Sequence, residues 1–235
     1  MSVATAPSLA QLLGPQDEAL VLYDAALIAM RPRRRWWRPA PGARLRVRSS
    51  GGGLRALPLE RYLGMPGPAE ESVLMRARGP VLDVGCGPAR LTVALTRRGV
   101  PALGVDIAPA AVALARRRGA AVLQRSVFAE LPGAGRWAST LLLDGNLGIG
   151  GDPVRLVSRI RRLLRPGGEL LVELDPPGTP SGPELLRLER DAAASAWFPW
   201  ARVGADQIGV LAARCELVIG ECWSVDGRWF ARLRA

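Results

Sequence analysis

From residue 80 onward, short apolar runs alternate with stretches in which apolar residues recur at helical spacing. The short runs predict five strands, at 81–84, 102–105, 121–123, 140–143 and 169–174. The helical spacing predicts helices over 90–98, 109–118 and 154–164, each ended by Gly or Pro. This alternation predicts a mostly parallel sheet wrapped by helices.

The pattern changes at the C-terminus and in two further stretches. A helix is predicted over 205–214, and the Asp226-Gly227 turn between runs 216–223 and 228–233 predicts a hairpin that adds an antiparallel strand. Residues 1–79 form an N-terminal extension or lid, with a helix from the apolar run 19–30, a hairpin around 51–53 and a helix beginning in 70–75. Within the domain expected at 80–235, residues 175–204 are a Pro- and aromatic-rich insertion, a candidate cap over an acceptor site.

Chain length and composition indicate how large a core the protein can bury, and the sequence shows where its positive charge lies. A chain of 235 residues with 49% apolar content can bury one core with an elaboration. The net charge is +11, but eight Arg and no acidic residue lie in the segment from Arg31 to Arg48, so the remainder is nearly balanced. Arginines beside Trp36 and Trp37 could bind phosphates and stack on the bases of a nucleic acid. The alternative interpretation is a solvated loop.

Missing residue types exclude several chemistries. The chain has no His, which removes hydrolytic triads and His-based metal sites. Its three cysteines, Cys86, Cys215 and Cys222, have no CxxC spacing, so a disulfide framework and a thiolate metal site are not predicted. The run 19–30 is too short to span a bilayer. We therefore expect a soluble, cytoplasmic protein with no metal and no membrane association.

The candidate chemistry begins at Gly85-Cys86-Gly87, directly after the first predicted strand. Glycines in this turn allow the backbone to approach a ligand closely at the carboxyl edge of a parallel sheet. Asp106 lies 19 residues after Gly87, where a carboxylate can accept hydrogen bonds from ribose hydroxyls. A nucleoside-containing ligand is therefore predicted. The dinucleotide fingerprint would require a third glycine where Arg90 stands.

With these residues in register, residues 80–235 resemble the class I, Rossmann-like methyltransferase family. The resemblance is carried by Val81-Leu82-Asp83-Val84-Gly85-Cys86-Gly87-Pro88, Gly104-Val105-Asp106-Ile107, Leu163-Leu164-Arg165-Pro166-Gly167-Gly168 and the terminal hairpin. It implies a doubly wound seven-stranded α/β sheet and S-adenosyl-L-methionine as cofactor. The cofactor-binding residues it implies are Asp83 near the methionine end, Gly85, Cys86 and Gly87 beneath the cofactor, Asp106 and Ile107 at the ribose, Ser126, Val127 and Phe128 at the adenine, and Asp144.

The loop after the fourth predicted strand and the insertion supply candidates for the acceptor site. Asp144 and Asn146 are the candidate catalytic residues, although Asn146 fits a turn position equally well. Asp152 is interpreted as a helix N-cap. In the insertion, Trp197, Trp200 and Arg202 are candidates for walls and an anion anchor, with lid packing as the alternative.

We therefore predict an S-adenosylmethionine-dependent methyltransferase that acts on a small-molecule acceptor. Without His, any proton removal would fall to Asp144, Asp152, Asp175, Glu173 or solvent, unless the acceptor is already nucleophilic. The main alternative is a nucleic-acid-binding module or RNA methyltransferase that uses the segment from Arg31 to Arg48. A nicotinamide-dependent oxidoreductase is disfavoured by Arg90 and the terminal hairpin. The methylated atom and the oligomeric state stay open.

Overall fold

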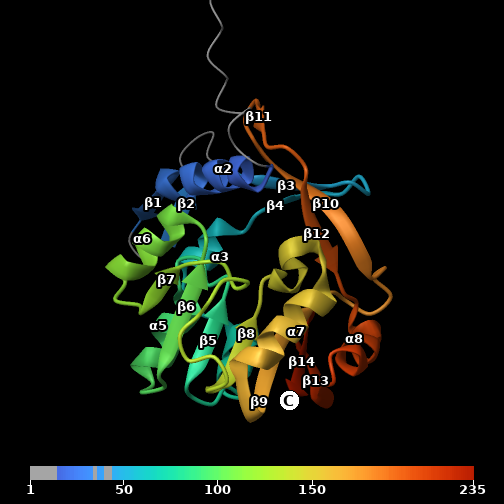
Figure 1. Cartoon of the computed structure of the whole chain (residues 1–235). Coiled ribbons are helices and arrows are strands. Elements are labelled where there is room, and N and C mark those ends of the chain that lie inside the picture. The colour runs from blue at the N-terminus through green and yellow to red at the C-terminus, as the bar shows by residue number, and fades with distance from the viewer. Residues whose placement is uncertain (1–14, 34–35, 40–43) are drawn as a thin grey trace, which may run out of the picture.

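The computed structural model describes residues 15–33, 36–39 and 44–235. A seven-stranded sheet with the order β13-β14-β9-β8-β5-β6-β7 forms its centre (Figure 1). In chain order its strands are β5 (Val81–Val84), β6 (Ala102–Asp106), β7 (Val122–Gln124), β8 (Trp137–Leu142), β9 (Leu164–Leu174), β13 (Val218–Val225) and β14 (Arg228–Arg234). Strands β5 to β9 are parallel, and β14 lies antiparallel to both β9 and β13. The predicted fold class and terminal hairpin are confirmed.

Helices cover both faces of this sheet, because alternate residues of each strand point to opposite sides. Leu141 of β8 packs in one cluster with the helices of one face, whereas its neighbour Leu142 packs with those of the other. The helices are α4 (Pro68–Leu74) and α5 (Arg90–Arg97) on the first face, α7 (Pro153–Leu163) and α8 (Ile208–Arg214) on the second, and α6 (Pro109–Arg117) beside β7. Asp152 accepts from the backbone N–H of Arg155 at 3.0 Å, which confirms it as the N-cap of α7.

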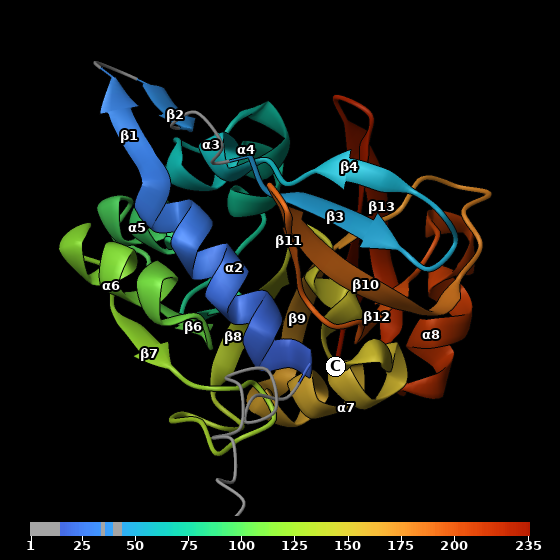
Figure 2. The same cartoon turned by 90° about the horizontal axis from the view of Figure 1, so that it is seen from above.

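The N-terminal extension and the insertion join in a second sheet, which the sequence pattern did not predict. Its strands are β3 (Arg46–Ser49), β4 (Leu54–Ala56), β10 (Gly182–Arg190), β11 (Ala193–Ala194) and β12 (Phe198–Arg202). Strand β10 pairs antiparallel with β3, although more than 130 residues separate them in the chain, and β12 pairs with the same β10. We call these five strands the cap sheet; it lies over the ends of the central strands (Figure 2). The hairpin predicted around 51–53 is its β3–β4 pair.

Helix α2 (Pro15–Ala29) lies beside the cap sheet (Figure 2). Its Ala26 and Leu27 pack in one apolar cluster with Leu186 and Leu188 of β10 and with Ala111 of α6. Two hydrogen bonds fix the helix: Glu18 accepts from the backbone N–H of Ala196 at 2.6 Å, and Asp24 accepts from that of Ala110 at 3.0 Å. Helix α2 is thereby tied to both the insertion and the central domain.

The remaining N-terminal elements are the hairpin of β1 (Met30–Arg33) and β2 (Trp36–Pro39) and the short helix α3 (Leu59–Leu63). Two short 3-10 helices, η1 (Asn146–Gly151) and η2 (Ala205–Gln207), lie before α7 and α8. Residues 34–35 and 40–43 of the segment from Arg31 to Arg48 lie outside the described residues. At its described end, Arg48 pairs with Glu189 of β10 at 2.6 Å, so this guanidinium serves the cap sheet. Among the described helices, none is long and apolar enough to cross a membrane.

Candidate active site

The glycine-rich turn between β5 and α5 has the backbone shape that its sequence predicts. Gly85 and Gly87 have φ of 67° and 54°, values that glycine adopts without steric cost. The backbone N–H of Gly85 donates to the carbonyl of Val105, and that of Gly87 donates to the carboxylate of Asp106 at 2.7 Å. The turn after β5 and the end of β6 are thus joined through Asp106.

Asp106 lies at the carboxyl end of β6, with its second oxygen accepting from the backbone N–H of Ala108 at 2.8 Å. Burial raises the pKa of this carboxyl, and the backbone donors of Ala108 and Gly87 partly oppose that rise. The residue lines the main cavity, so its lone pairs not used by the backbone can meet a ligand there.

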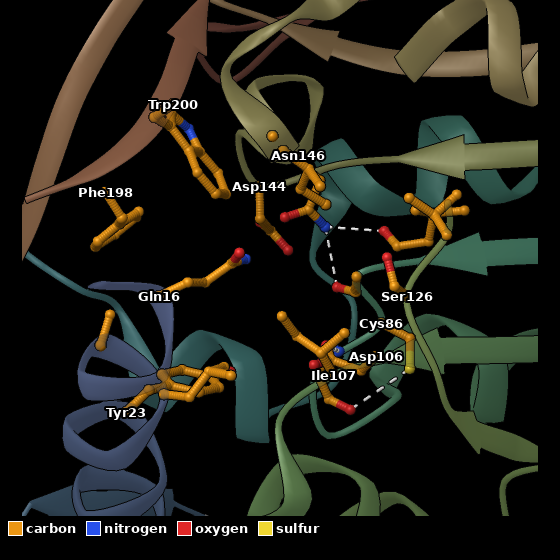
Figure 3. Close-up of a pocket in the computed structure, with 18 of the residues that line it drawn as sticks. Gln16, Tyr23, Cys86, Asp106, Ile107, Ser126, Asp144, Asn146, Phe198 and Trp200 are labelled. Carbon is orange, nitrogen blue, oxygen red and sulfur yellow. Dashed lines mark hydrogen bonds between the residues drawn. The ribbon is translucent and has the colours of Figure 1, made fainter. Parts of the chain in front are cut away.

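The main cavity has a volume of about 580 Å³ and lies between the carboxyl ends of the central strands and the cap (Figure 3). Nine of the ten predicted cofactor residues line it: Gly85, Cys86, Gly87, Asp106, Ile107, Ser126, Val127, Phe128 and Asp144. The four loops after β5, β6, β7 and β8 supply these residues. Parallel strands therefore bring the predicted set together at one edge of the sheet.

Asp83 is the one predicted cofactor residue that does not line the cavity. Its side chain is buried within the sheet and accepts a hydrogen bond from the hydroxyl of Thr92 at 2.8 Å. Burial raises the pKa of this carboxyl to about 6, and the Thr92 hydrogen bond opposes the rise. Asp83 thus stands near the end of β5, just before the glycine turn, and its place near the methionine end of the cofactor stays a prediction.

Asp144, a predicted catalytic residue, sits in an ion-pair cluster. Its oxygens lie 2.8 Å from Arg90, 3.1 Å from Arg61 and 3.3 Å from Arg228. Its backbone N–H donates to Glu173 at 2.6 Å. Arg90 is 4% exposed and also pairs with Glu70 at 2.9 Å, so the arginine in the place of a third glycine is a buried anchor of this cluster.

Asn146, the other predicted catalytic residue, lines the cavity and uses its amide to hold the glycine turn (Figure 3). Its Nδ2 donates to the carbonyl oxygens of Val84 at 3.0 Å and Gly85 at 2.9 Å. Ser126 accepts from the backbone N–H of Phe128 at 3.2 Å, so its hydroxyl orders its own turn while the residue lines the cavity.

Of the three predicted substrate residues, Trp200 alone lines the main cavity. Trp197 is 36% exposed and stacks with the guanidinium of Arg187, and Arg202 pairs with Asp175 at 2.7 Å. Neither residue lines the main cavity. Phe198, an aromatic residue of the same predicted stretch, packs edge-on against Trp200 and lines the cavity.

The cavity also receives residues from the N-terminal extension that sequence reasoning missed. Gln16 and Tyr23 of α2 point into the cavity (Figure 3), and Leu20 of the same helix also lines it. Arg55 of β4 and Tyr62 of α3 line the cavity as well. Burial and the nearby charge of Asp106 raise the pKa of Tyr23 well above its usual value. Helical spacing in 19–30 predicted a buried face, but no local signal shows that this face meets a ligand cavity.

The residues around this cavity fit S-adenosylmethionine. An added Cβ at Gly87 would meet the hydroxyl of Tyr23 at 3.4 Å across the turn, so the lack of side chains keeps the space between α2 and the turn open. Asp106 offers carboxylate oxygens on one side, and apolar Ile107, Val127 and Phe128 line the same cavity. Acceptors for ribose hydroxyls and apolar walls for a purine ring are what the nucleoside part requires. Among the described residues, no group of His, Cys, Asp or Glu is arranged to hold a metal ion.

The order of the central strands and the antiparallel β14 define a Rossmann-like, class I methyltransferase architecture. Residues 81–168 match the family model described as a methyltransferase domain, and the chain therefore contains a domain of this family. A ubiquinone biosynthesis O-methyltransferase of Pseudomonas paraeruginosa is 33% identical over 101 residues, which cover 39% of this chain and 42% of that protein. The chain thus matches less than half the length of this curated relative.

Solved structures share the fold over more of the chain. A S-adenosylmethionine-dependent methyltransferase of Bacteroides fragilis, in complex with S-adenosyl-L-homocysteine, has a TM-score of 0.72 and 22% identity over 94% of this chain and 96% of its own. The 1,6-didemethyltoxoflavin-N1-methyltransferase of Burkholderia thailandensis has a TM-score of 0.54 and 21% identity over 69% and 75%. The first likeness covers the cap as well as the central sheet.

Proposed function

We propose that this protein transfers the methyl group of S-adenosylmethionine to a small-molecule acceptor. The observation that carries the proposal is the cavity in which nine predicted cofactor residues meet the aromatic side chains of the cap. The named relatives support a small acceptor, since one is an O-methyltransferase of ubiquinone biosynthesis and another is a 1,6-didemethyltoxoflavin-N1-methyltransferase. The cofactor, when bound, supplies an electrophilic methyl group on sulfur.

The residues of the chain would act by binding and alignment. Asp106 would accept hydrogen bonds from the ribose, and the turn at Gly85 and Gly87 would allow the cofactor to lie against the backbone. The cap and α2 would exclude water from the cavity, and Phe198 and Trp200 would orient the acceptor. Alignment of this kind contributes up to about 7–11 kcal/mol to a displacement reaction.

Two subordinate proposals accompany this function. The N-terminal extension (1–79) and the insertion (175–204) act together as a cap and lid over the domain at 80–235, since their strands pair in one sheet. A cytoplasmic location is supported by three free cysteines, Cys86, Cys215 and Cys222, which suit a reducing compartment. Nucleic-acid binding by the segment from Arg31 to Arg48 has no support in the named relatives, and its described end, Arg48, is engaged by Glu189.

Isothermal calorimetry with S-adenosylmethionine, S-adenosylhomocysteine and NAD tests the proposal. We expect both sulfur compounds to bind and NAD not to bind. Asp106→Asn should weaken both by about 10- to 100-fold, because hydrogen bonds to a charged acceptor are lost. Asp226→Asn is the matched control, since it makes the same change at an exposed turn residue with φ of 52°. Binding of NAD without binding of either sulfur compound would contradict the proposal.

A further inference from the structure

A second, smaller cavity adjoins the main one, and its lining includes several charged side chains. Its volume is about 170 Å³, and it shares Arg55, Tyr62 and Asp144 with the main cavity. Its lining also includes Glu173, near the end of β9, and Asp175, directly after that strand. Asp106 and the glycine turn line the main cavity but not the smaller one, so we take the end of the main cavity at Arg55, Tyr62 and Asp144 as the acceptor end.

The cap supplies an apolar wall to the same end. Leu186 and Leu188 of β10 and Phe198 and Trp200 of β12 line the main cavity together with Val47 of β3. The rings of Phe198 and Trp200 meet edge to face, with centroids 6.1 Å apart. Side chains of this kind bind flat apolar groups well.

The carboxylates on this side are already engaged. Asp144 and Glu173 both accept hydrogen bonds from Arg228, and Asp175 accepts from Arg202. Removal of a proton from an acceptor by any of the three would require an ion pair to break. Asp106 lies at the ribose end, where backbone N–H groups hold it. Asp144, Glu173 and Asp175 are therefore poorly placed to act as general bases, because each would have to leave its arginine.

The remaining polar groups favour an anion. Burial, with the charge of Asp144, raises the pKa of Tyr62 to about 12 against the opposing charges of Arg61, Arg55 and Arg90, so its phenol stays protonated and can donate. Arg55 is exposed toward both cavities, and no described carboxylate forms an ion pair with it. A guanidinium and a phenol hydroxyl therefore face the acceptor end as donors.

Resting on the proposed methyl transfer, we infer that the acceptor has a flat apolar body and a reacting oxygen that is ionised before it binds, held by Arg55 and Tyr62. Carboxylates and acidic phenols share this chemistry. In the transfer, a lone pair of the acceptor oxygen forms the new carbon–oxygen bond while the bond between the methyl carbon and sulfur breaks. The electron pair of the broken bond stays on sulfur. The negative oxygen and the positive sulfur both become neutral, and no proton moves. Such a step needs no general base, which agrees with a chain that has no His.

The test is binding of matched probes to the protein saturated with S-adenosylhomocysteine, measured by calorimetry. Benzoate is compared with benzamide, and 4-nitrophenol above its pKa with 4-nitroaniline, because each pair has nearly the same shape and differs in charge. We expect the anionic member of at least one pair to bind tenfold or more tightly than its neutral partner. Equal binding within both pairs, or binding of neither member, would overturn the inference.

Variants assign the effect to the named residues. Arg55→Gln should weaken the anionic probe by about 10- to 100-fold and Tyr62→Phe by about tenfold, with the neutral probe unchanged. Arg46→Gln is the matched control, since Arg46 is exposed on the adjacent strand β3 and lines neither cavity. Undiminished anion binding in folded Arg55→Gln would contradict the role of Arg55.

Turnover measurements then distinguish methylation of a carboxylate from methylation of a phenol. They also distinguish failure of this inference from failure of the proposed function. With methyl-labelled S-adenosylmethionine, a product that releases label in mild alkali is an ester, and a stable one is an ether; either supports the inference. Methylation of neutral amines alone would overturn it while leaving the proposed function intact. Failure to bind S-adenosylhomocysteine at all would instead count against the proposed function.

Discussion

The side-chain amide of Asn146 locks the turn at Gly85 to the loop after β8. Its Nδ2 lies 2.9 Å from the carbonyl oxygen of Gly85, and a Cβ added at Gly85 would lie 2.5 Å from the same nitrogen. Gly85 also has φ of 67°, which an L side chain rarely adopts. Two loops of the cofactor site are therefore held together by a contact that requires glycine on one side and an amide donor on the other.

Asn146→Ala is expected to lower the free energy of unfolding by about 1–3 kcal/mol, because two partly buried carbonyl oxygens lose their donor. S-adenosylhomocysteine binding should weaken as well, since the glycine turn loses its support. Urea unfolding and calorimetry measure the two effects, with Gln124→Ala, an exposed amide at the end of β7, as the control. Unchanged stability with only a raised KM for the acceptor would show instead that Asn146 orients the acceptor.

The central sheet and its site were predictable because each signal is local. The short apolar run of each strand, the glycine directly after β5 and the acid at the end of β6 all lie within a few residues of the features they determine. Parallel strands then place these ends together without further information. The loop at Asp144 and Asn146 was found in this way, although the partners of its side chains were not.

The cap was not predictable from the same signals. Strand β10 pairs with β3 across more than 130 residues, and no local pattern records a partner at that distance. The residue set 175–204 is rich in Pro and aromatics, which obscured the alternation in β10. Trp197 and Trp200 look alike in sequence, yet only the side chain of Trp200 faces the cavity, because the pairing register of β12 decides its direction.

Gly148→Ala should displace the cap strand β12. A Cβ at Gly148 would lie 2.2 Å from Nε1 of Trp200 and 2.5 Å from the carbonyl oxygen of Ala201, so the strand has to move. We expect a loss of about 1–3 kcal/mol in unfolding free energy and a shift in Trp fluorescence. Gly51→Ala is the control, because its nearest contact, Ser49, is 3.8 Å away. A fully stable Gly148→Ala with unchanged fluorescence would contradict this packing.

Asp83 predicts a dependence of stability on pH. Its pKa is about 6 in the folded protein against 3.8 for the free side chain, so the folded state binds the proton more tightly. The contribution of Asp83 to stability is therefore full below pH 3.8 and is lost as the pH rises through 6, by roughly 3 kcal/mol at most. Asp83→Asn keeps an acceptor for Thr92 and should remove this slope.

Urea midpoints between pH 4 and pH 7 measure the slope, with Asp226→Asn as the control for the same substitution at an exposed site. Titration of Glu70 does not contribute to the change in stability between pH 4.5 and pH 7. Arg228 and Arg90 hold the pKa of Glu70 at about 2 despite its burial, so its contribution is present above 4.5 and is lost only as the pH falls toward 2. Identical slopes in wild type and Asp83→Asn would refute the raised pKa.

The tethers of α2 should control how long the cofactor stays bound. Glu18 and Asp24 accept hydrogen bonds from the backbone of Ala196 and Ala110, and between these tethers Tyr23 faces the cavity (Figure 3). Each tether contributes about 0.5–1.5 kcal/mol. Their loss in the double variant Glu18→Ala and Asp24→Ala should favour an open helix and raise the dissociation rate of S-adenosylhomocysteine by about 10- to 100-fold. Because the residues at the glycine turn are intact, the association rate should change little.

Stopped-flow displacement measures these rates in the full chain. Glu18→Gln combined with Asp24→Asn retains an oxygen acceptor at each position and should restore slow release, which separates the tether from the charge. Val21 lies on the exposed face of the same helix, so Val21→Ala is the control for changes in the helix itself. A double alanine variant that folds and releases S-adenosylhomocysteine at the wild-type rate would show that α2 does not retain the cofactor. Faster release of S-adenosylhomocysteine from the double alanine variant, together with slow release from the double variant Glu18→Gln with Asp24→Asn, would establish the role of the tethers. Two hydrogen bonds to backbone N–H groups, made by residues outside the glycine turn, would then keep the site closed.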